Sequence, residues 1–192
     1  MADPIYKTDR LILRPFADTD FDAVYSYASC PENLAYILWE PDTAEDTRVF
    51  LRQAADAFRQ KPQFLYSFAA VRQSDRRLIG GCELHLENAD TAEIGWILHL
   101  DCWRQGYGTE MGRFLLELGF RTLGLRRISA HCDIDNVGSW KIMEKIGMRR
   151  EGCFVQGRRA GRFSGKKWTD ELSYAILADE WRAVPDMLEC GR

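Results

Sequence analysis

Three strand-like segments lie close together in the middle of the chain and constrain its fold more than any other feature. They are 63–72 (QFLYSFAAVR), 78–86 (LIGGCELHL) and 91–100 (TAEIGWILHL), separated only by the polar turns 73–77 and 87–90. Turns this short join antiparallel neighbours, because a parallel connection needs a crossover of about a dozen residues or more. The segments therefore predict an antiparallel meander of three strands.

The flanking segments alternate between strand-like and helix-like patterns. Before the meander, residues 10–16 (RLILRPF) predict a strand, and helices are expected at 18–28, at 31–38 and after the capping residue Thr43. After it, the pattern predicts a helix over 107–122, a strand over 126–134, a helix over 136–148 and two strands near 153–159 and 167–177. This order predicts an α+β fold with a mixed, mostly antiparallel sheet flanked by helices. A length of 192 residues predicts a single domain, 1–192.

Composition excludes several classes of function. No apolar run reaches the ~20 residues of a membrane span, and the N-terminus MADPIYKTDR has no signal core, so we expect a cytoplasmic protein without a membrane partner. The six cysteines are scattered singly, so neither a metal site nor a disulfide framework is expected. A net charge of −3 argues against nucleic-acid binding. Residues 61–192 carry 18 acids against 20 bases, which makes that part less repulsive to a polyanionic ligand.

The junction 102–120 (CWRQGYGTEMGRFLLELGF) joins a strand to a helix through closely spaced glycines. Gly106 and Gly108 permit a close backbone approach, and unpaired amides at a helix start near Tyr107 could bind a pyrophosphate, with Arg104 adding positive charge. The alternative is a plain strand-to-helix turn, because neither a GKS or GKT sequence nor the third glycine of a dinucleotide fingerprint follows. Gly112 and Gly119, seven apart on one helix face, predict close packing on the sheet.

The sequence resembles the GNAT superfamily of acyl-CoA-dependent N-acetyltransferases. Its acetyl-CoA segment Q/R-x-x-G-x-G/A corresponds to residues 103–108, although Trp103 stands at the first position, as is usual in the branch that acetylates ribosomal-protein N-termini. Residues 135–152 (DNVGSWKIMEKIGMRREG) resemble the family's N-x-x-S…K-x-G-F segment followed by E-G, and 10–20 (RLILRPFADTD) resemble the first strand of that branch.

The resemblance implies acetyl-CoA as cosubstrate and a set of residues that bind it. The strand over 93–100 would splay from its neighbour, and the pantetheine arm would lie along the opened edge. Asn136 would contact the pantetheine, although a helix cap followed by Ser139 is the alternative for this residue. The backbone groups of Ile97 and Leu98 would pair with the arm, Lys145 or Lys141 would meet phosphate, and the pyrophosphate would be held by the amides of Arg104, Gln105, Gly106, Tyr107, Gly108 and Thr109.

Acetyl transfer requires a neutral amine. A lysine-like amine is neutral in only about one of 2,500 molecules at pH 7, whereas an α-amine is neutral in about one of seven. The resemblance places a proton-accepting carboxylate at Glu93 and an oxyanion-binding N–H near Leu98. Many family members use a tyrosine as the acid at the position of Met143, and Ser139 is the substitute suggested by the ribosomal-protein branch.

The acceptor pocket is the least constrained part of the sequence. Tyr36, Trp39 and Trp96, and the histidines His85, His99 and His131, can line it or serve only structural roles. The basic segment 158–167 can be a solvated loop or contact an acidic partner, and Cys102 shows no sign of activation.

The expected reaction is direct attack of a primary amine on acetyl-CoA in a ternary complex. The acceptor expected first is a protein N-terminal α-amine. The alternatives are a small-molecule amine or antibiotic, a non-catalytic acyl-CoA sensor and a nucleotide-binding protein. Because similar proteins are commonly dimers, a second copy of the chain is also among the expected partners, as a homodimer.

Overall fold

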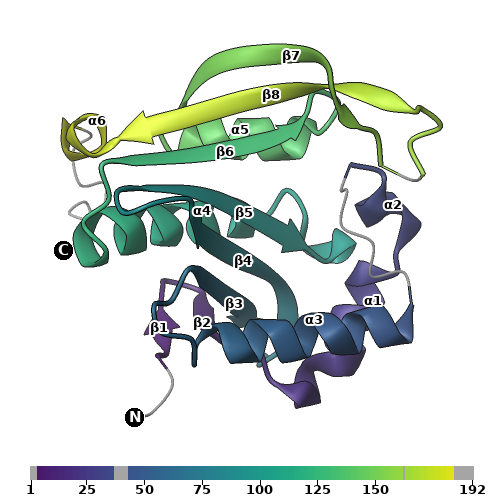
Figure 1. Ribbon diagram of the computed structural model, residues 1–192. Helices are drawn as coiled ribbons and strands as arrows, with labels where there is room; N and C mark the ends of the chain where they lie inside the picture. Colours follow the sequence, from purple (N-terminus) through teal and green to yellow (C-terminus); the bar gives the residue numbers. More distant parts are fainter. Residues whose placement is uncertain (1–3, 37–42, 162, 184–192) are drawn as a thin grey trace.

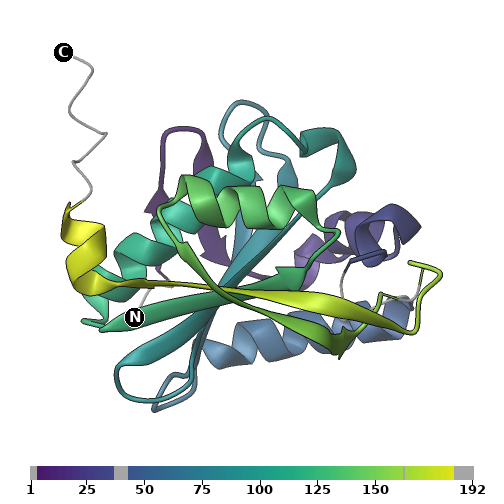
Figure 2. The ribbon, with the colours of Figure 1, turned by 90° about the horizontal axis from the view of Figure 1, so that it is seen from above.

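The computed structural model describes residues 4–36, 43–161 and 163–183. One eight-stranded sheet has the order β1-β2-β3-β4-β5-β6-β8-β7, and helices lie against both of its faces (Figure 1, Figure 2). The strands are β1 (Tyr6–Lys7), β2 (Leu11–Pro15), β3 (Leu65–Arg72), β4 (Leu78–Leu86), β5 (Thr91–Leu98), β6 (Arg127–Asp133), β7 (Arg149–Arg159) and β8 (Trp168–Leu177). The helices are α1 (Phe21–Ala28), α2 (Pro31–Leu34), α3 (Ala44–Ala57), α4 (Tyr107–Glu117), α5 (Val137–Lys145) and α6 (Ala178–Ala183).

The strand pairing makes the sheet mixed but mostly antiparallel. Every neighbouring pair is antiparallel except β5 and β6, which are parallel because α4 carries the chain back between them. The predicted meander is confirmed as β3, β4 and β5, with Ser67 opposite Glu83 and Glu83 opposite Gly95. The predicted α+β fold is therefore confirmed.

Some element boundaries differ from the predicted ones. The helix expected over 107–122 is α-helical only to Glu117, because the Leu123 N–H donates to the Leu118 carbonyl five residues back and the last turn widens into a π-helix. The short elements β1 and α6 were not predicted. The helix expected over 31–38 ends at Leu34, and residues 37 and 38 lie outside the described residues.

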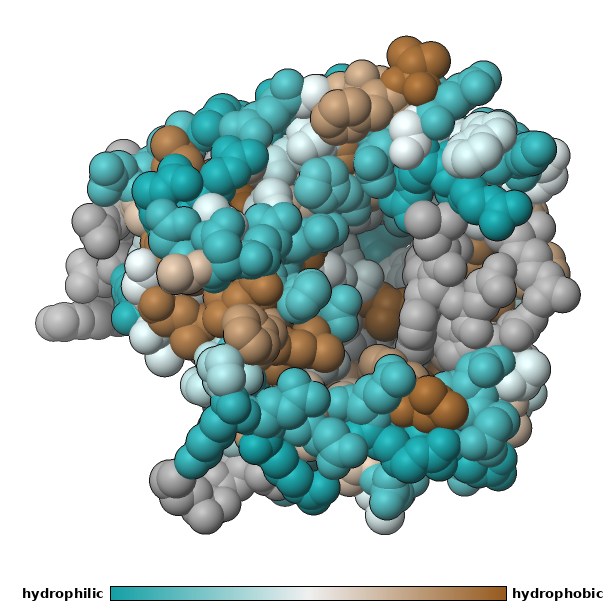
Figure 3. Space-filling view, in the orientation of Figure 1, coloured by the Kyte–Doolittle hydropathy of each residue, from teal (hydrophilic) through white to brown (hydrophobic). Residues whose placement is uncertain are grey.

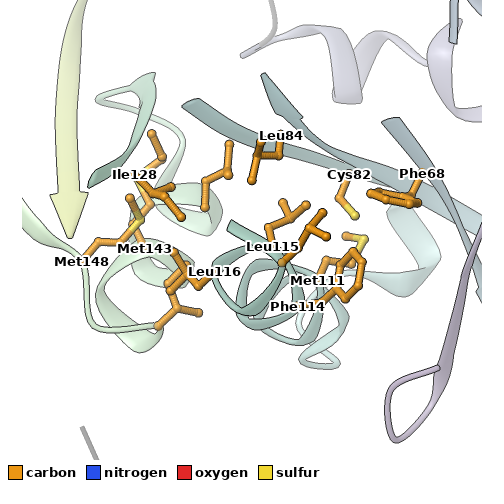
Figure 4. Packing of buried hydrophobic residues seen from close by; sticks show 14 of the residues in the cluster. Phe68, Cys82, Leu84, Met111, Phe114, Leu115, Leu116, Ile128, Met143 and Met148 are labelled. Atoms are coloured by element: carbon orange, nitrogen blue, oxygen red, sulfur yellow. The ribbon is translucent and has the colours of Figure 1, made fainter. Parts of the chain in front are cut away.

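The main hydrophobic core lies between the sheet and α4. Met111, Leu115 and Leu118 follow one another at helical spacing and are all buried. Figure 4 shows α4 side chains packed against Phe68 and Leu84 of the sheet. A second cluster on the opposite face joins α1 and α3 to the strands. The helical layers therefore fix β3, β4 and β5 from both sides.

Small residues let α4 approach its neighbours closely. A Cβ added at Gly108 would lie 2.4 Å from the Ile142 Cδ1 of α5, and one added at Gly119 would lie 2.5 Å from the Ile128 Cδ1 of β6. The close packing predicted for Gly119 on the sheet is thus present. A Cβ added at Gly112 would lie 3.0 Å from the Cδ1 of Ile146, which directly follows α5, and 3.5 Å from the Trp96 Cζ3 of β5.

Candidate active site

Strands β5 and β6 separate soon after they begin. They pair only where residues 91–93 lie opposite residues 127–129, whereas β5 continues to Leu98 along β4 and β6 continues to Asp133 along β8. Figure 1 shows the two strands diverging from this point. From Ile94 onward, β5 and β6 therefore no longer pair with each other, and a gap opens between their facing edges.

The hydrogen bonds between β4 and β5 determine which backbone groups of β5 face the gap. The Glu87 N–H donates to the Thr91 carbonyl at 3.0 Å, and the His99 N–H donates to the Ile79 carbonyl at 2.8 Å. Backbone groups alternate in direction along an antiparallel ladder, so the odd-numbered residues of β5 bond to β4. The even-numbered residues turn their N–H and C=O groups toward the gap: Ile94, Trp96 and Leu98.

This alternation changes the expected roles of Ile97 and Leu98. The backbone of Ile97 faces β4, because the Ile97 carbonyl oxygen would lie only 2.2 Å from a Cβ added at Gly80 of that strand. Only the side chain of Ile97 therefore lines the cavity. The Leu98 carbonyl already accepts the Trp103 indole N–H at 3.0 Å, so its N–H is the group left for a ligand. Trp96, whose backbone is not among the contacts expected from the resemblance, presents its N–H and C=O to the gap.

A cavity of about 590 Å³ lies where β5 and β6 separate. In the orientation of Figure 3, it is visible as a hollow in the surface. Its floor is the odd-numbered face of the meander: Leu65, Ser67, Gly81, Glu83, Glu93, Gly95 and Ile97. Side chains that cover this face form one wall: Phe16, Tyr27, Tyr36, Phe50 and Gln53. Across the gap, the lining comes from β6 and α5: His131, Cys132, Asn136, Ser139 and Met143.

The cavity also settles which predicted acceptor residues lie near the gap. Tyr36, Trp96 and His131 line it, whereas His85 and His99 do not. Trp39 lies outside the described residues.

The start of α4 presents unpaired backbone amides. Arg104 and Gly106 have φ angles of 58° and 86°, which turn the chain sharply before the helix. The Gly106 carbonyl accepts the Glu110 N–H at 3.1 Å, and no side chain of the described residues caps the helix. In the described part of the chain, the N–H groups of Tyr107, Gly108 and Thr109 have no acceptor, so the positive end of the helix is open to an anion.

Arg10 and Glu110 support this loop, and sequence reasoning missed both. The Arg10 Nη1 donates to the Gln105 carbonyl at 2.9 Å, and its guanidinium stacks over the Tyr107 ring at 4.4 Å. The Glu110 carboxylate accepts hydrogen bonds from the Arg10 side chain and backbone, each at 2.8 Å. The available signal was an acid in the first helical turn together with an arginine that begins the first predicted strand.

Glu93 and His131 form a pair across the beginning of the gap. The Glu93 Oε1 lies 3.2 Å from the His131 Nδ1, and the His131 Nε2 lies 3.2 Å from the Ser173 Oγ. The hydrogen bond from His131 lowers the pKa of Glu93, and the same bond raises the pKa of His131. Glu93 is therefore a weaker base than an isolated glutamate.

The start of α5 carries Asn136 and Ser139. The Asn136 Oδ1 accepts the Ser139 N–H at 3.0 Å, so the helix-cap alternative is present, and both residues also line the cavity. Ser139 also hydrogen-bonds the Cys132 thiol, whose pKa burial raises to about 11. Lys145 stands exposed in the last turn of α5, outside the cavity lining.

Other candidates take structural positions. Burial raises the pKa of Cys102 to about 11, which keeps its thiol neutral and unsuited to nucleophilic attack. Arg158, from the basic segment, does not remain a solvated loop residue: it lines the cavity with its Nη1 3.7 Å from the Glu171 Oε1. Lys166 of the same segment pairs with Asp135 at 2.5 Å.

Within the described ranges, no cluster of three His, Cys, Asp or Glu side chains could hold a metal ion, and no helix is long and apolar enough to cross a membrane.

Comparison with known proteins identifies the family. The model of the acetyltransferase (GNAT) domain matches residues 10–149. An uncharacterized N-acetyltransferase, YnaD of Bacillus subtilis, is 35% identical over 175 residues, covering 91% of this chain and 97% of YnaD. The crystal structure of a GNAT-family acetyltransferase from Bacillus anthracis shares 33% identity with a TM-score of 0.79, covering 92% of this chain and 99% of that one.

A more distant structure shares the fold. RimL, a ribosomal L7/L12 alpha-N-protein acetyltransferase solved in complex with coenzyme A, has a TM-score of 0.79 at 18% identity, over 92% of this chain and 99% of RimL. Together with the matched domain and the relatives above 30% identity, the splayed strands and the open helix start have one explanation. The chain belongs to the GNAT family of acetyl-CoA-dependent N-acetyltransferases.

Proposed function

We propose that this acetyltransferase transfers the acetyl group to a primary amine by direct attack in a ternary complex. The observation that carries the proposal is the cavity that passes through the gap in the sheet, with α5 residues on one side and α1 and α3 residues on the other. Acetyl-CoA would enter from the α4 and α5 side and the amine from the other, so both would meet without a covalent enzyme intermediate.

Acetyl-CoA would bind along the gap. The pantetheine arm would pair with the backbone groups of Trp96 and the N–H of Leu98, while the Ile97 side chain supports it from the floor. The amides from Arg104 to Thr109, including those of Gln105, Gly106, Tyr107 and Gly108, would hold the pyrophosphate. Asn136 retains its side-chain amide for the pantetheine while its Oδ1 caps the helix, and Lys145 would meet a phosphate.

Charge stabilisation during the reaction would come from the β5 edge. The Trp96 N–H points into the gap and would bind the oxyanion of the tetrahedral intermediate. Ser139 would return a proton to the leaving thiolate. The role of Glu93 as proton acceptor stays a prediction, and it competes with the hydrogen bond that this carboxylate already accepts from His131.

Two acceptor classes follow from the sequence and the cavity. A protein N-terminal α-amine is supported by the resemblance of Trp103 and its neighbours to the ribosomal-protein branch. A small-molecule amine is supported by the aromatic wall formed by Phe16, Tyr27 and Phe50, which suits a compact acceptor.

A thiol-release assay tests the proposal. Acetyl-CoA would be offered with a panel of small primary amines and N-terminal peptides, and CoA binding would be measured by calorimetry. Release of CoA that depends on one acceptor class, with an acetylated product of the expected mass, supports ternary-complex transfer. An acetylated enzyme that forms without acceptor and then passes its acetyl group to the amine would overturn it.

A further inference from the structure

Glu83 lies at the centre of the cavity floor between two small residues. It is on β4, with Ser67 opposite on β3 and Gly95 opposite on β5, and all three line the cavity. A Cβ placed at Gly95 would lie 3.8 Å from the Glu83 Cγ and 3.9 Å from its Oε1. The carboxylate therefore leans across Gly95 and stays open to the cavity.

This position is next to the place where the thioester would bind. The Trp96 N–H faces the gap, so a carbonyl oxygen bound to it brings the reacting carbon level with Gly95 and Trp96. Because Gly95 has no side chain, this position leaves space between that carbon and the Glu83 carboxylate. An amine that approaches from the α1 and α3 side would pass this carboxylate.

Glu83 differs from the other cavity carboxylates, each of which lies beside a described cationic or imidazole side chain. Glu93 is paired with His131 at 3.2 Å, and Glu171 lies 3.7 Å from Arg158. Among the residues that the structure describes, none forms a hydrogen bond or ion pair with the Glu83 carboxylate. A carboxylate that pairs with no described cation is suited to receive one from the substrate, which for an amine is its ammonium group.

We propose that Glu83 is the proton acceptor of this enzyme and the residue that binds the ammonium form of the acceptor. The inference rests on the proposed acetyl transfer. The ammonium ion gives one proton to Glu83, and the freed lone pair attacks the thioester carbonyl carbon to form a C–N bond. As the intermediate collapses, the C–S bond breaks; Ser139 gives its hydroxyl proton to the leaving thiolate and takes the second nitrogen proton in its place. The products are the amide and CoA thiol, and Glu83 releases its proton to water.

The surrounding charges favour this assignment. Burial raises the pKa of Glu83, and the negative charge of Glu93 adds to the effect, while His85 on the same strand opposes it. Glu83 is thus the stronger base of the two, because the pKa of Glu93 is lowered. The titratable groups that line the cavity with Glu83 from other elements are Glu93 on β5, His131 and Cys132 on β6, Arg158 on β7, Glu171 on β8, Tyr27 on α1 and Tyr36 after α2.

The test compares Glu83→Gln with Glu93→Gln, using an amine that the wild type acetylates. We expect Glu83→Gln to lower kcat/KM about 100-fold at pH 7, within the usual range for a lost general base, and Glu93→Gln to lower it less than about 10-fold. The rate of Glu83→Gln should then rise about tenfold per pH unit up to the pKa of the amine, because only the neutral amine reacts. The rate of the wild-type enzyme should rise less steeply with pH.

Two controls keep the result interpretable. Calorimetry with acetyl-CoA should give Glu83→Gln a wild-type affinity, which shows an intact fold and cosubstrate site. Glu117→Gln removes the same charge from the exposed surface of α4, outside the cavity lining, and should keep the wild-type pH profile. A wild-type pH profile in Glu83→Gln, or the large loss appearing in Glu93→Gln instead, would overturn the assignment while wild-type thiol release still supports acetyl transfer.

Discussion

Arg10 and Glu110 join the beginning of the sheet to the anion-binding end of α4. Their side chains meet at 2.8 Å although they lie 100 residues apart in the sequence. The same guanidinium holds the Gln105 carbonyl, so one side chain orients both the loop and the first turn of the helix. The loop amides thereby have fixed directions before a ligand arrives.

Replacing Arg10 should therefore weaken CoA binding without unfolding the protein. In Arg10→Met, the loop loses its anchor at Gln105, and about 1 kcal/mol of lost preorganisation corresponds to about a fivefold higher Kd for CoA. Calorimetry measures the change. Arg113→Met removes the same charge from the exposed face of α4 and is the matched control. Equal Kd values for the two variants would contradict the anchoring role.

The example of Arg10 marks the limit of what the sequence could predict. Short turns and periodic apolar residues are local signals, so the meander, α4 and α5 could be predicted with nearly correct ends. The closely spaced Gly106 and Gly108 before α4 were also a local signal. The contact between Arg10 and Glu110 depends on how the first strand is placed beside α4, and no local pattern encodes it.

Strand pairing limited the prediction of the site in the same way. The divergence of β5 from β6 was expected only from the resemblance, and the direction of each backbone group follows from the register with β4. Because of that register, the backbone groups of Trp96, and not those of Ile97, lie at the open edge of β5. The partner of Glu93 was equally hidden, because His131 reaches it only through the parallel pairing of β5 with β6.

Gly108 should be required for the packing of α4 on α5. An added methyl group would lie 2.4 Å from the Ile142 Cδ1, and we expect Gly108→Ala to destabilise the protein by about 1–3 kcal/mol through overpacking. Urea unfolding measures this change. Ile142→Val removes the clashing methyl group, so the double variant should be more stable than the sum of the single changes predicts. Strict additivity would show that the two side chains do not compete for this space.

The pair of Glu93 and His131 should contribute to stability in a limited range of pH. The raised pKa of His131 gives stability that is present below its ordinary value of 6.5 and is lost as pH rises through the folded value. The lowered pKa of Glu93 gives stability that is present above its ordinary value of 4.5 and is lost as pH falls through the folded value. The contribution is therefore greatest between these two ordinary values.

His131→Gln should consequently lose the most stability relative to the wild type near the middle of that range and less at pH 8. The difference should stay below about 1 kcal/mol, because both side chains are partly exposed and solvent screens them. Urea unfolding at the two pH values measures it, with His85→Gln as the control histidine. A loss that is the same at both pH values would mean that His131 stabilises the fold by packing alone.

Gly95 should be required for catalysis but not for folding. The nearest atoms to an added methyl group are those of Glu83 at 3.8 and 3.9 Å, which is ordinary contact distance, so Gly95→Ala should unfold at the same urea concentration as the wild type or slightly higher. The methyl group would nevertheless stand between the Glu83 carboxylate and the thioester position. We expect kcat/KM to fall about tenfold, a loss typical of a displaced reacting group. Gly152→Ala adds a methyl group to β7 with similar room, 3.9 Å from the Phe154 ring, and should keep full activity. A fully active Gly95→Ala enzyme would show that the amine does not reach the thioester over this glycine.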